Sequence, residues 1–279
     1  MEKETECYRF EKYDTNNNSL FDKSIDCTYI IHLEDNGRLD SIQAQLKQYI
    51  PTRTIYIVFN KGFRKCEKNL YKNISYADLT HSYIQIFQHA KEKEYNNILI
   101  LEDDFIFDTS IKDPYVIRDI ETFLIKNRNT RYIYSLGTLP IIQLPSLNYT
   151  YTKMNIYALT SHSIIYSKKM REYTLKYSIE EIGDWDGYLN SWGNLYIKYM
   201  YYKPLCYQLF TDTENSKNWG KNNAVNILQF GKISKWIVKK LKLDTQFEPG
   251  YRIFYILSQY ICILLFFIVY IIVYYSIKT

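Results

Sequence analysis

The stretch NNILILEDDFIFD, residues 96–108, decides the expected fold. Its four aliphatic residues at 98–101 are followed directly by Glu102, Asp103 and Asp104. A short continuous apolar run is typical of a strand that is buried on both faces of a sheet. Ligands of open α/β sheets bind beyond the carboxyl ends of such strands. The three acids therefore indicate a ligand site, with a solvated turn or a helix-capping acid as the alternative.

Strand and helix patterns alternate around this stretch. Short apolar runs rich in β-branched residues predict further strands at 28–33, 54–59 and 131–137. Helical spacing of apolar residues predicts helices at 39–46, 75–94 and 113–127, and a strand leading into a helix at 157–175. This order predicts an α/β domain with a Rossmann-like, mainly parallel central sheet. The chain contains neither GxGxxG nor GxxxxGKS/T, which disfavours dinucleotide-binding dehydrogenases and P-loop NTPases.

The far end of the chain predicts a membrane span. Residues 253–277 contain no charged side chain. A helix of that length is roughly 37 Å long, more than the roughly 30 Å of a bilayer's hydrocarbon core. A buried core helix is the alternative, but globular helices are seldom apolar on every face. We expect four parts: a loose polar arm at 1–26, an α/β domain at 27–220, a basic amphipathic membrane-surface segment at 221–250 and a transmembrane helix at 251–277.

The net charge of +5 is unevenly placed. Five lysines crowd together before the predicted span: Lys232, Lys235, Lys239, Lys240 and Lys242. Their spacing predicts an amphipathic helix on an anionic membrane surface, with a solvated helix face as the alternative. The positive-inside rule then predicts a single-pass C-terminal anchor with the domain facing the cytosol. The other charges are nearly balanced, which argues against a nucleic-acid partner.

The cysteines and glycosylation motifs carry little signal on their own. The five cysteines, Cys7, Cys27, Cys66, Cys206 and Cys262, are odd in number and show no CxxC spacing. This argues against structural zinc and gives poor support for a disulfide framework, so a reducing compartment is the simpler interpretation. Three Asn-x-Ser/Thr sequons begin at Asn17, Asn73 and Asn148, and we interpret them as chance matches in an Asn-rich chain.

The three acids suit a divalent cation. Alternation along an extended chain places Glu102 and Asp104 on one side, about 7 Å apart, and Asp103 on the other. Two carboxylates on one side suit a hard cation that also binds phosphate oxygens. Such an ion would neutralise a nucleotide diphosphate as it leaves.

Several blocks of the chain resemble family 25 glycosyltransferases, the lipopolysaccharide-type and collagen-type galactosyl- and glucosyltransferases. In that family a Leu-Ser-His motif opens a helix before a hydrophobic strand that ends in Glu-Asp-Asp. Here Leu79, Thr80 and His81 resemble the first motif, and residues 102–104 match the second. Blocks similar to others of the family follow in the same order, at 29–38, 156–170, 182–190 and 203–210. The resemblance covers roughly residues 27–215.

This resemblance implies a GT-A fold, a nucleotide-sugar donor such as a UDP-sugar, and Mn²⁺ or Mg²⁺. It implies that Asp104 is the main metal ligand, that Glu102 contacts the metal or a ribose, and that Asp103 supports them. Further residues matched to donor or cofactor binding are Arg38, His81 and Gln208. The alternative for His81 is a core or helix-cap residue, and the alternative for Gln208 is a contact with the acceptor.

The resemblance also implies an inverting transfer, which needs a base for the acceptor hydroxyl. Asp186 or Asp184 is placed by order for that task, and Trp185 between them offers an aromatic face to a sugar. The alternative for this pair is a turn stabilised by the flanking glycines Gly183 and Gly187.

The chain departs from the family pattern at several points. Thr80 replaces the serine of the Leu-Ser-His motif, and Arg38 comes one residue early. The glycine before the Leu-Ser-His motif is absent, His32 replaces an asparagine, and no histidine follows Asp186. A third metal ligand would come from elsewhere, for example Asp212 or Glu214. The leading hypothesis is a metal-dependent hexosyltransferase acting on a glycan, lipid-linked or protein acceptor at a membrane. The alternatives are a catalytically inactive membrane-anchored adaptor and a metal-dependent phosphoryl-transfer enzyme or nuclease; the oligomeric state is not specified.

Overall fold

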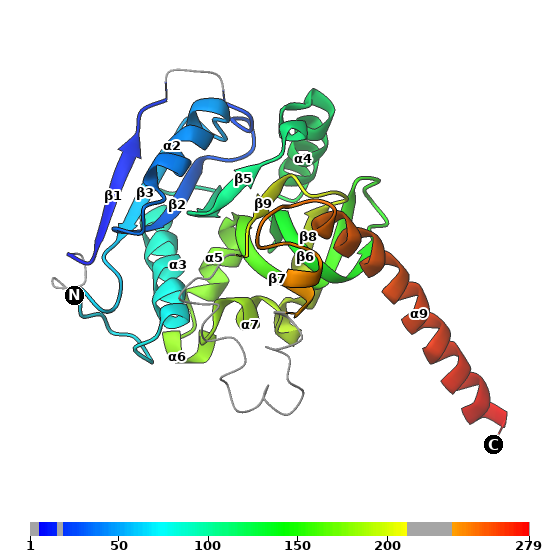
Figure 1. Ribbon diagram of the computed structural model, residues 1–279. Coiled ribbons are helices and arrows are strands. Elements are labelled where there is room, and N and C mark those ends of the chain that lie inside the picture. Colours follow the sequence, from blue (N-terminus) through cyan, green and yellow to red (C-terminus); the bar gives the residue numbers. More distant parts are fainter. Residues whose placement is uncertain (1–5, 16–18, 211–235, 279) are drawn as a thin grey trace.

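The computed structural model describes residues 6–15, 19–210 and 236–278 (Figure 1). The strands are β1 (Tyr8–Tyr13), β2 (Cys27–Leu33), β3 (Ile55–Asn60), β4 (Asn97–Glu102), β5 (Phe105–Phe107), β6 (Ile133–Pro145), β7 (Thr152–Ser167), β8 (Lys198–Tyr201) and β9 (Cys206–Gln208). The helices are α2 (Leu39–Gln48), α3 (Ser75–Glu92), α4 (Pro114–Lys126), α5 (Lys168–Thr174), α6 (Ile179–Ile182), α7 (Trp185–Leu189) and α9 (Gly250–Lys278), with 3₁₀ turns η1 (Thr109–Lys112) and η2 (Trp192–Ile197).

The central sheet has seven strands in the order β1-β3-β2-β4-β7-β6-β8, while β5 pairs with β9. The parallel set β3-β2-β4 confirms the strands predicted at 28–33 and 54–59 and the one before Glu102. The prediction of a mainly parallel sheet is wrong, because β1 and β7 run antiparallel to their neighbours in that set. Since β6 and β7 are joined by the short segment 146–151, they pair as a long antiparallel hairpin. The fold is therefore mixed α/β.

The N-terminal segment is less loose than the sequence predicts. Residues 8–13 form the edge strand β1, which pairs antiparallel with β3. Phe21 and Ile25 are buried in the core. Cys7 and Cys66 form a disulfide bond, with a Cα–Cα separation of 5.7 Å that is ordinary for such bonds. The expectation of unpaired cysteines is thus wrong for these two, because their proximity depends on the pairing of β1 with β3.

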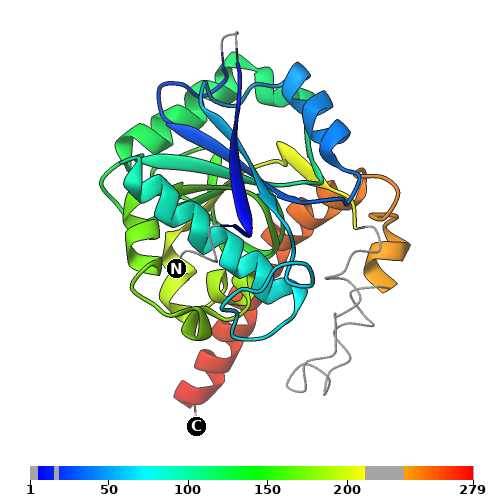
Figure 2. The same cartoon turned by 90° about the vertical axis from the view of Figure 1, so that its left-hand side faces the viewer.

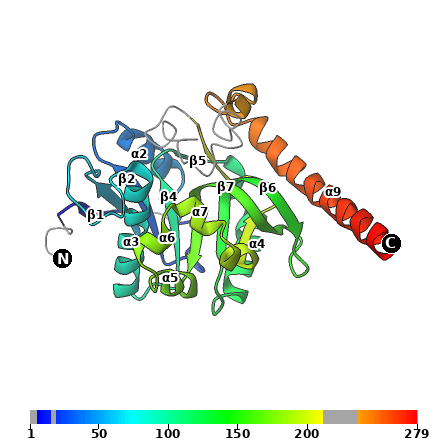
Figure 3. The same ribbon diagram turned by 90° about the horizontal axis from the view of Figure 1, so that it is seen from below.

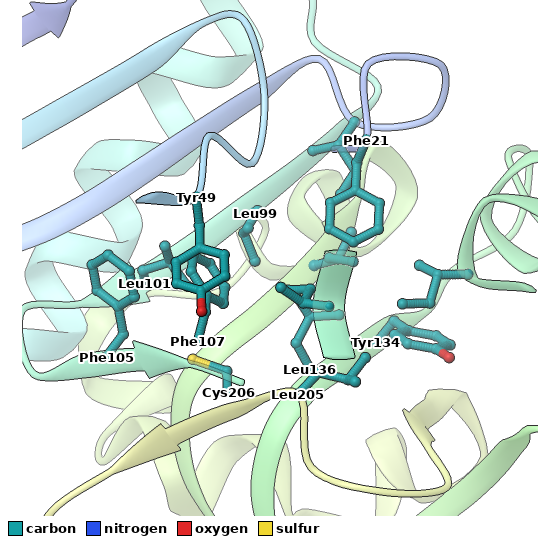
Figure 4. Close-up of a cluster of buried hydrophobic side chains, with 14 of the residues drawn as sticks. Phe21, Tyr49, Leu99, Leu101, Phe105, Phe107, Tyr134, Leu136, Leu205 and Cys206 are labelled. Carbon is teal, nitrogen blue, oxygen red and sulfur yellow. The ribbon is translucent and has the colours of Figure 1, made fainter. Parts of the chain in front are cut away.

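Helices cover both faces of the sheet (Figures 2 and 3). On one face, α2 and α4 pack over strand residues such as Leu99 and Leu101. Figure 4 shows these two leucines in the buried cluster, together with Phe21 and Leu136. On the other face, α3, α5 and α7 pack over the intervening strand residues, Ile98 and Ile100 among them. β4 is therefore buried on both faces, as its apolar run predicts.

The first turns of α9 belong to the domain. Tyr251 and Tyr255 are buried against Leu139, Met200 and Tyr207 in a third apolar cluster. The remainder of the helix is mostly exposed and projects away from the sheet (Figures 1 and 3). By length and composition, residues 250–276 can cross a membrane. Half of the predicted amphipathic segment, including Lys232 and Lys235, lies outside the described residues, and residues 236–240 are helical.

Gly137 of β6 lies directly against the backbone of Cys206, which leaves no room for a side chain at this position. A Cβ at this position would lie 1.9 Å from the carbonyl oxygen of Cys206 and 2.7 Å from Nε2 of His162. We expect Gly137→Ala to destabilise the protein by roughly 1–3 kcal/mol or more, because backbone would have to move. Thermal unfolding of the full chain in detergent measures this. Gly193→Ala is the control, since its Cβ would meet its nearest atom at 3.8 Å; equal melting of both variants would refute the prediction.

His162 makes a second stability prediction, this time on pH. It is fully buried, and burial lowers its pKa to about 4, so it is neutral in the folded protein. An unfolded histidine has a pKa near 6.5. Between pH 6.5 and 4 the unfolded state therefore binds more protons, and stability falls as pH drops, by up to about 1.4 kcal/mol per pH unit. We expect His162→Gln to flatten this slope in melting curves measured from pH 7 to 4. An unchanged slope would show that other groups cause it.

Candidate active site

The site lies where two parallel strands end. In the register of β2 and β4, Ile31 lies opposite Glu102, so the residues that follow both strands meet at one edge of the sheet. Asp103 and Asp104 form the turn from β4 to β5. This is the edge at which α/β proteins bind ligands.

Asp103 ties the two strand ends together. It accepts hydrogen bonds from Arg38 Nη1 at 2.6 Å, from the backbone N–H of Leu33 at 3.2 Å, and from the side chain of Asn36. Burial alone would raise its pKa, but the nearby His32 ring and the charge and hydrogen bonds of Arg38 outweigh burial and lower it. Asp103 is therefore a carboxylate with its partners already in place, which suits the supporting role predicted for it.

Asp104 has one oxygen occupied and one open. Oδ2 accepts from Arg38 Nη1 at 3.1 Å and from Gln208 Nε2 at 2.9 Å. Oδ1 is buried and has no hydrogen-bond partner in the structure. Burial raises the pKa of Asp104 to about 6, although the charge of Arg38 opposes the shift. A buried carboxylate oxygen without a partner is costly, so it marks a place where a ligand would be stabilised.

Glu102 turns toward α3 and β7. Its Oε1 accepts from the Tyr83 hydroxyl at 3.1 Å and from Ser161 Oγ at 3.3 Å. Burial raises its pKa to about 8, and the negative charges of Asp104 and Asp186 add to the shift. Glu102 therefore shares one electrostatic environment with both aspartates.

Asp186 completes the acidic cluster from α7. Its side chain is exposed to solvent, yet surrounding protein raises its pKa to about 6, with a further contribution from the charge of Asp184. An exposed residue whose pKa is nevertheless raised by the surrounding protein lies in a recess of the surface that solvent can reach. Ser161, which donates to Glu102 Oε1, opposes this shift in the pKa of Asp186, so it lies near both acids.

Asp184 has a different environment. Its carboxylate caps the N-terminus of α7 by accepting from the backbone N–H of Gly187 at 2.9 Å. It also lines a surface hollow of about 500 Å³, together with the rings of Tyr173, Tyr177 and Tyr188. The sequence offered a turn stabilised by the flanking glycines as the alternative for this pair, and Asp184 instead caps a helix with the N–H of one of them, Gly187. The hollow leaves Asp184 accessible to a ligand.

The structure separates two other predicted residues from this network. Trp185 is buried, stacks on Tyr83 with ring centroids 4.4 Å apart, and donates from Nε1 to the Tyr166 hydroxyl. It therefore cannot offer its face to a sugar, and that prediction is wrong. His81 is buried on α3 and its Nδ1 lies 2.8 Å from the Tyr8 hydroxyl of β1. A role for His81 in donor binding stays a prediction.

Sequence reasoning missed the residues that position the acids: His32, Asn36, Tyr83 and Ser161. Tyr83 lies on an apolar helical stripe, where a core role is the ordinary interpretation, and its hydroxyl contact depends on tertiary packing. His32 has no partner that its neighbours in sequence reveal, yet its Nδ1 lies 3.5 Å from Asp103 Oδ2. The one usable signal was its place at the end of a predicted strand parallel to β4.

The residues fit a divalent ion only in part. Among the described residues no group of three acidic, histidine or cysteine side chains is arranged around one point. The open Oδ1 of Asp104, with Glu102 in the same electrostatic environment, offers two carboxylates. That is sufficient for Mg²⁺-type binding, in which substrate phosphates and water supply the other ligands. Asp212 and Glu214 lie outside the described residues.

Comparisons with known proteins give little further guidance. The chain matches no protein-family model and no curated protein sequence. Among solved structures it is similar to one described as the crystal structure of a glycosyltransferase involved in the glycosylation of the major capsid of PBCV-1. The TM-score is 0.38 and the identity 10%, over 72% of this chain and 100% of the other. A likeness this distant leaves the function to be argued from the site.

Proposed function

We propose that this protein is a glycosyltransferase that moves a hexose from a nucleotide-sugar, namely a UDP-sugar, to a glycan, lipid-linked or protein acceptor at a membrane. The observation that carries the proposal is the acidic cluster at the end of β4, with a buried, unpartnered oxygen on Asp104 and a solvent-accessible carboxylate on Asp186. The resemblance of residues 27–215 to family 25 glycosyltransferases supplies the reaction class.

In this proposal the β4 acids and their partners bind the donor. Arg38 carries a positive charge beside Asp104 and can donate to pyrophosphate oxygens. Gln208 holds Asp104 in place through its side-chain amide. A bound Mn²⁺ or Mg²⁺, held by Asp104 and Glu102, would stabilise negative charge on the departing nucleotide diphosphate.

Asp186 is the residue we assign as the base. Its pKa of about 6 leaves it largely ionised at neutral pH while keeping it basic enough to accept a proton from an acceptor hydroxyl. Asp184 is less suited, because its carboxylate already caps α7. The tyrosine-lined hollow beside Asp184 instead suits an acceptor sugar, whose apolar face stacks on aromatic rings. Direct attack by the activated hydroxyl would invert the anomeric carbon.

The proposal places the enzyme at a membrane through α9. If the turns up to Ser258 belong to the domain, residues 259–277 still provide a helix of about 28 Å, close to the thickness of the hydrocarbon core. The cytosolic orientation predicted from the lysine cluster is opposed by the disulfide bond between Cys7 and Cys66.

The direct test is UDP release by the full chain in detergent, with Mn²⁺ and a panel of UDP-hexoses. We expect one donor to raise the melting temperature and to release UDP, because a ligand that binds only the folded state stabilises it. UDP binding without turnover would favour the inactive adaptor. That alternative is favoured by one observation, since Arg38 already satisfies Asp103 and one oxygen of Asp104 without a ligand. If the protein neither binds UDP nor turns over any donor, the glycosyltransferase proposal is overturned.

A further inference from the structure

Four features outside the site bear on where the globular domain resides: the disulfide bond, the buried free cysteines, two exposed sequons and the apolar helix α9. From them we infer that the domain lies in an oxidising compartment, on the non-cytosolic side of its membrane. We further infer that Asn73 and Asn148 are acceptor sites for N-linked glycans.

The disulfide bond is the first step. Cys7, which precedes β1, is fully buried, and its sulfur is bonded to that of Cys66 across 59 residues of sequence. The bond ties the sheet edge to the loop between β3 and α3. Disulfides that serve structure form and persist in oxidising compartments and are rare where thiols are kept reduced. Formation removes two electrons and two protons from the thiols, and the disulfide of an oxidoreductase takes them up and becomes two thiols.

The remaining cysteines are suited to the same environment. Cys27 and Cys206 are buried in the domain. Burial raises the pKa of Cys206 to about 12 and raises that of Cys27 as well, so neither forms the reactive thiolate readily. Cys262 lies in the apolar part of α9. An oxidising solution would therefore find no second pair of accessible thiols among the described residues.

The two described sequons lie where a glycan can be attached. Asn73 is exposed in the bend just before α3, in the triplet Asn73-Ile74-Ser75. Asn148 is exposed in the turn between β6 and β7, next to the fully exposed Leu147. An N-linked glycan is bulky and polar, so it requires a surface position of this kind. The third sequon, at Asn17, lies outside the described residues.

Attachment follows a defined exchange of bonds. The side-chain amide nitrogen of the asparagine bonds to C1 of the first sugar of a lipid-pyrophosphate-linked oligosaccharide. The bond between C1 and the pyrophosphate oxygen breaks, the pyrophosphate stays on the lipid, and the nitrogen loses one proton. This step takes place only on the side of the membrane where that donor is presented.

The lysines before α9 oppose this orientation, but they are the weaker signal. Charge near a span biases its orientation, whereas long domains cross membranes largely regardless of flanking charge. A structural disulfide indicates directly that the chain matured in an oxidising compartment.

The test uses the full chain expressed in eukaryotic cells, with Asn17→Gln in every version so that only two sites are counted. Removal of N-glycans by an endoglycosidase should lower the apparent mass of the parent chain by two glycans. The mass of Asn73→Gln and of Asn148→Gln should fall by one glycan each, and that of the double variant should not change. Thr150→Ser should keep the glycan that Thr150→Ala loses. Asn69→Gln is a nearby control outside any sequon and should shift like the parent.

Two further readouts need no variant. Mass spectrometry of the unreduced protein should find the Cys7 and Cys66 peptides linked, and protease added to sealed microsomes should leave the domain intact. An unshifted parent chain, or a domain digested in sealed microsomes, would overturn the inference. None of these readouts measures sugar transfer, so they test the inference independently of the proposed enzyme activity.

Discussion

Replacing Asp104 by Asn is expected to lower sugar transfer by about 10²–10³-fold, the loss typical of removing one electrostatic contact to developing charge. Asn retains the shape of the side chain and can accept from Arg38 and Gln208, but it cannot offer a negative oxygen at the open Oδ1 position. UDP release by the full chain in detergent, at saturating donor, measures the effect.

The same substitution should leave the fold intact. The raised pKa of Asp104 means that the folded protein disfavours its charged form, so a neutral side chain is tolerated. We expect an unchanged or higher melting temperature. The matched control is Asp35→Asn, since Asp35 is largely exposed and pairs with Lys65 at the surface, an interaction worth little. Full activity in the Asp104 variant would remove this residue from the mechanism.

The second large effect concerns α9. A chain that ends at residue 249 should fail to unfold cooperatively, whereas one that ends at residue 262 should melt as a folded domain. The shorter chain lacks Tyr251 and Tyr255, which are 0% and 3% exposed. Each such ring buries roughly 150–250 Å², worth roughly 4–6 kcal/mol at about 25 cal/mol per Å². The loss of two rings is comparable with the roughly 5–15 kcal/mol that stabilises a whole domain.

A milder variant separates packing from hydrogen bonding. The Tyr251 hydroxyl accepts from the backbone N–H of Gln208 at 2.9 Å and lies 3.1 Å from its carbonyl oxygen. Tyr251→Phe should keep the fold and lose roughly 1–3 kcal/mol. Circular dichroism melts in detergent measure both changes. If the chain ending at 249 melts like the longer one, the first turns of α9 are an addition to the domain and not part of its core.

The strands around the site could be predicted because their signal is local. The apolar run at 98–101 sits on β4, and the spacing of Leu39, Ile42 and Leu46 sits on α2. The antiparallel part of the sheet could not be predicted in the same way. Whether β7 runs beside β4 depends on contacts between residues that are far apart in sequence, and no local period records them.

The site residues also divide into those that a local pattern predicts and those whose positions depend on contacts between distant parts of the chain. Strand alternation predicted Glu102 and Asp104 on one side of the chain and Asp103 on the other. Glu102 bonds to Tyr83 and Asp103 to the β2 loop, but Asp103 and Asp104 both accept from Arg38 Nη1. The alternation does not extend to residues 103 and 104, because they form a turn and not an extended strand. The disulfide was missed because nothing local connects Cys7 with Cys66. Their proximity is created by β1 lying along β3, an arrangement that the polar composition of residues 1–26 conceals.

The hydrogen bonds between Tyr251 and Gln208 have a mechanical consequence. Gln208 also donates to Asp104, so a single residue separates the first turn of α9 from Asp104. If α9 spans a membrane as proposed, a helix that tilts with bilayer thickness begins one side chain away from Asp104. Lipid chain length therefore belongs among the variables of any reconstitution of this protein.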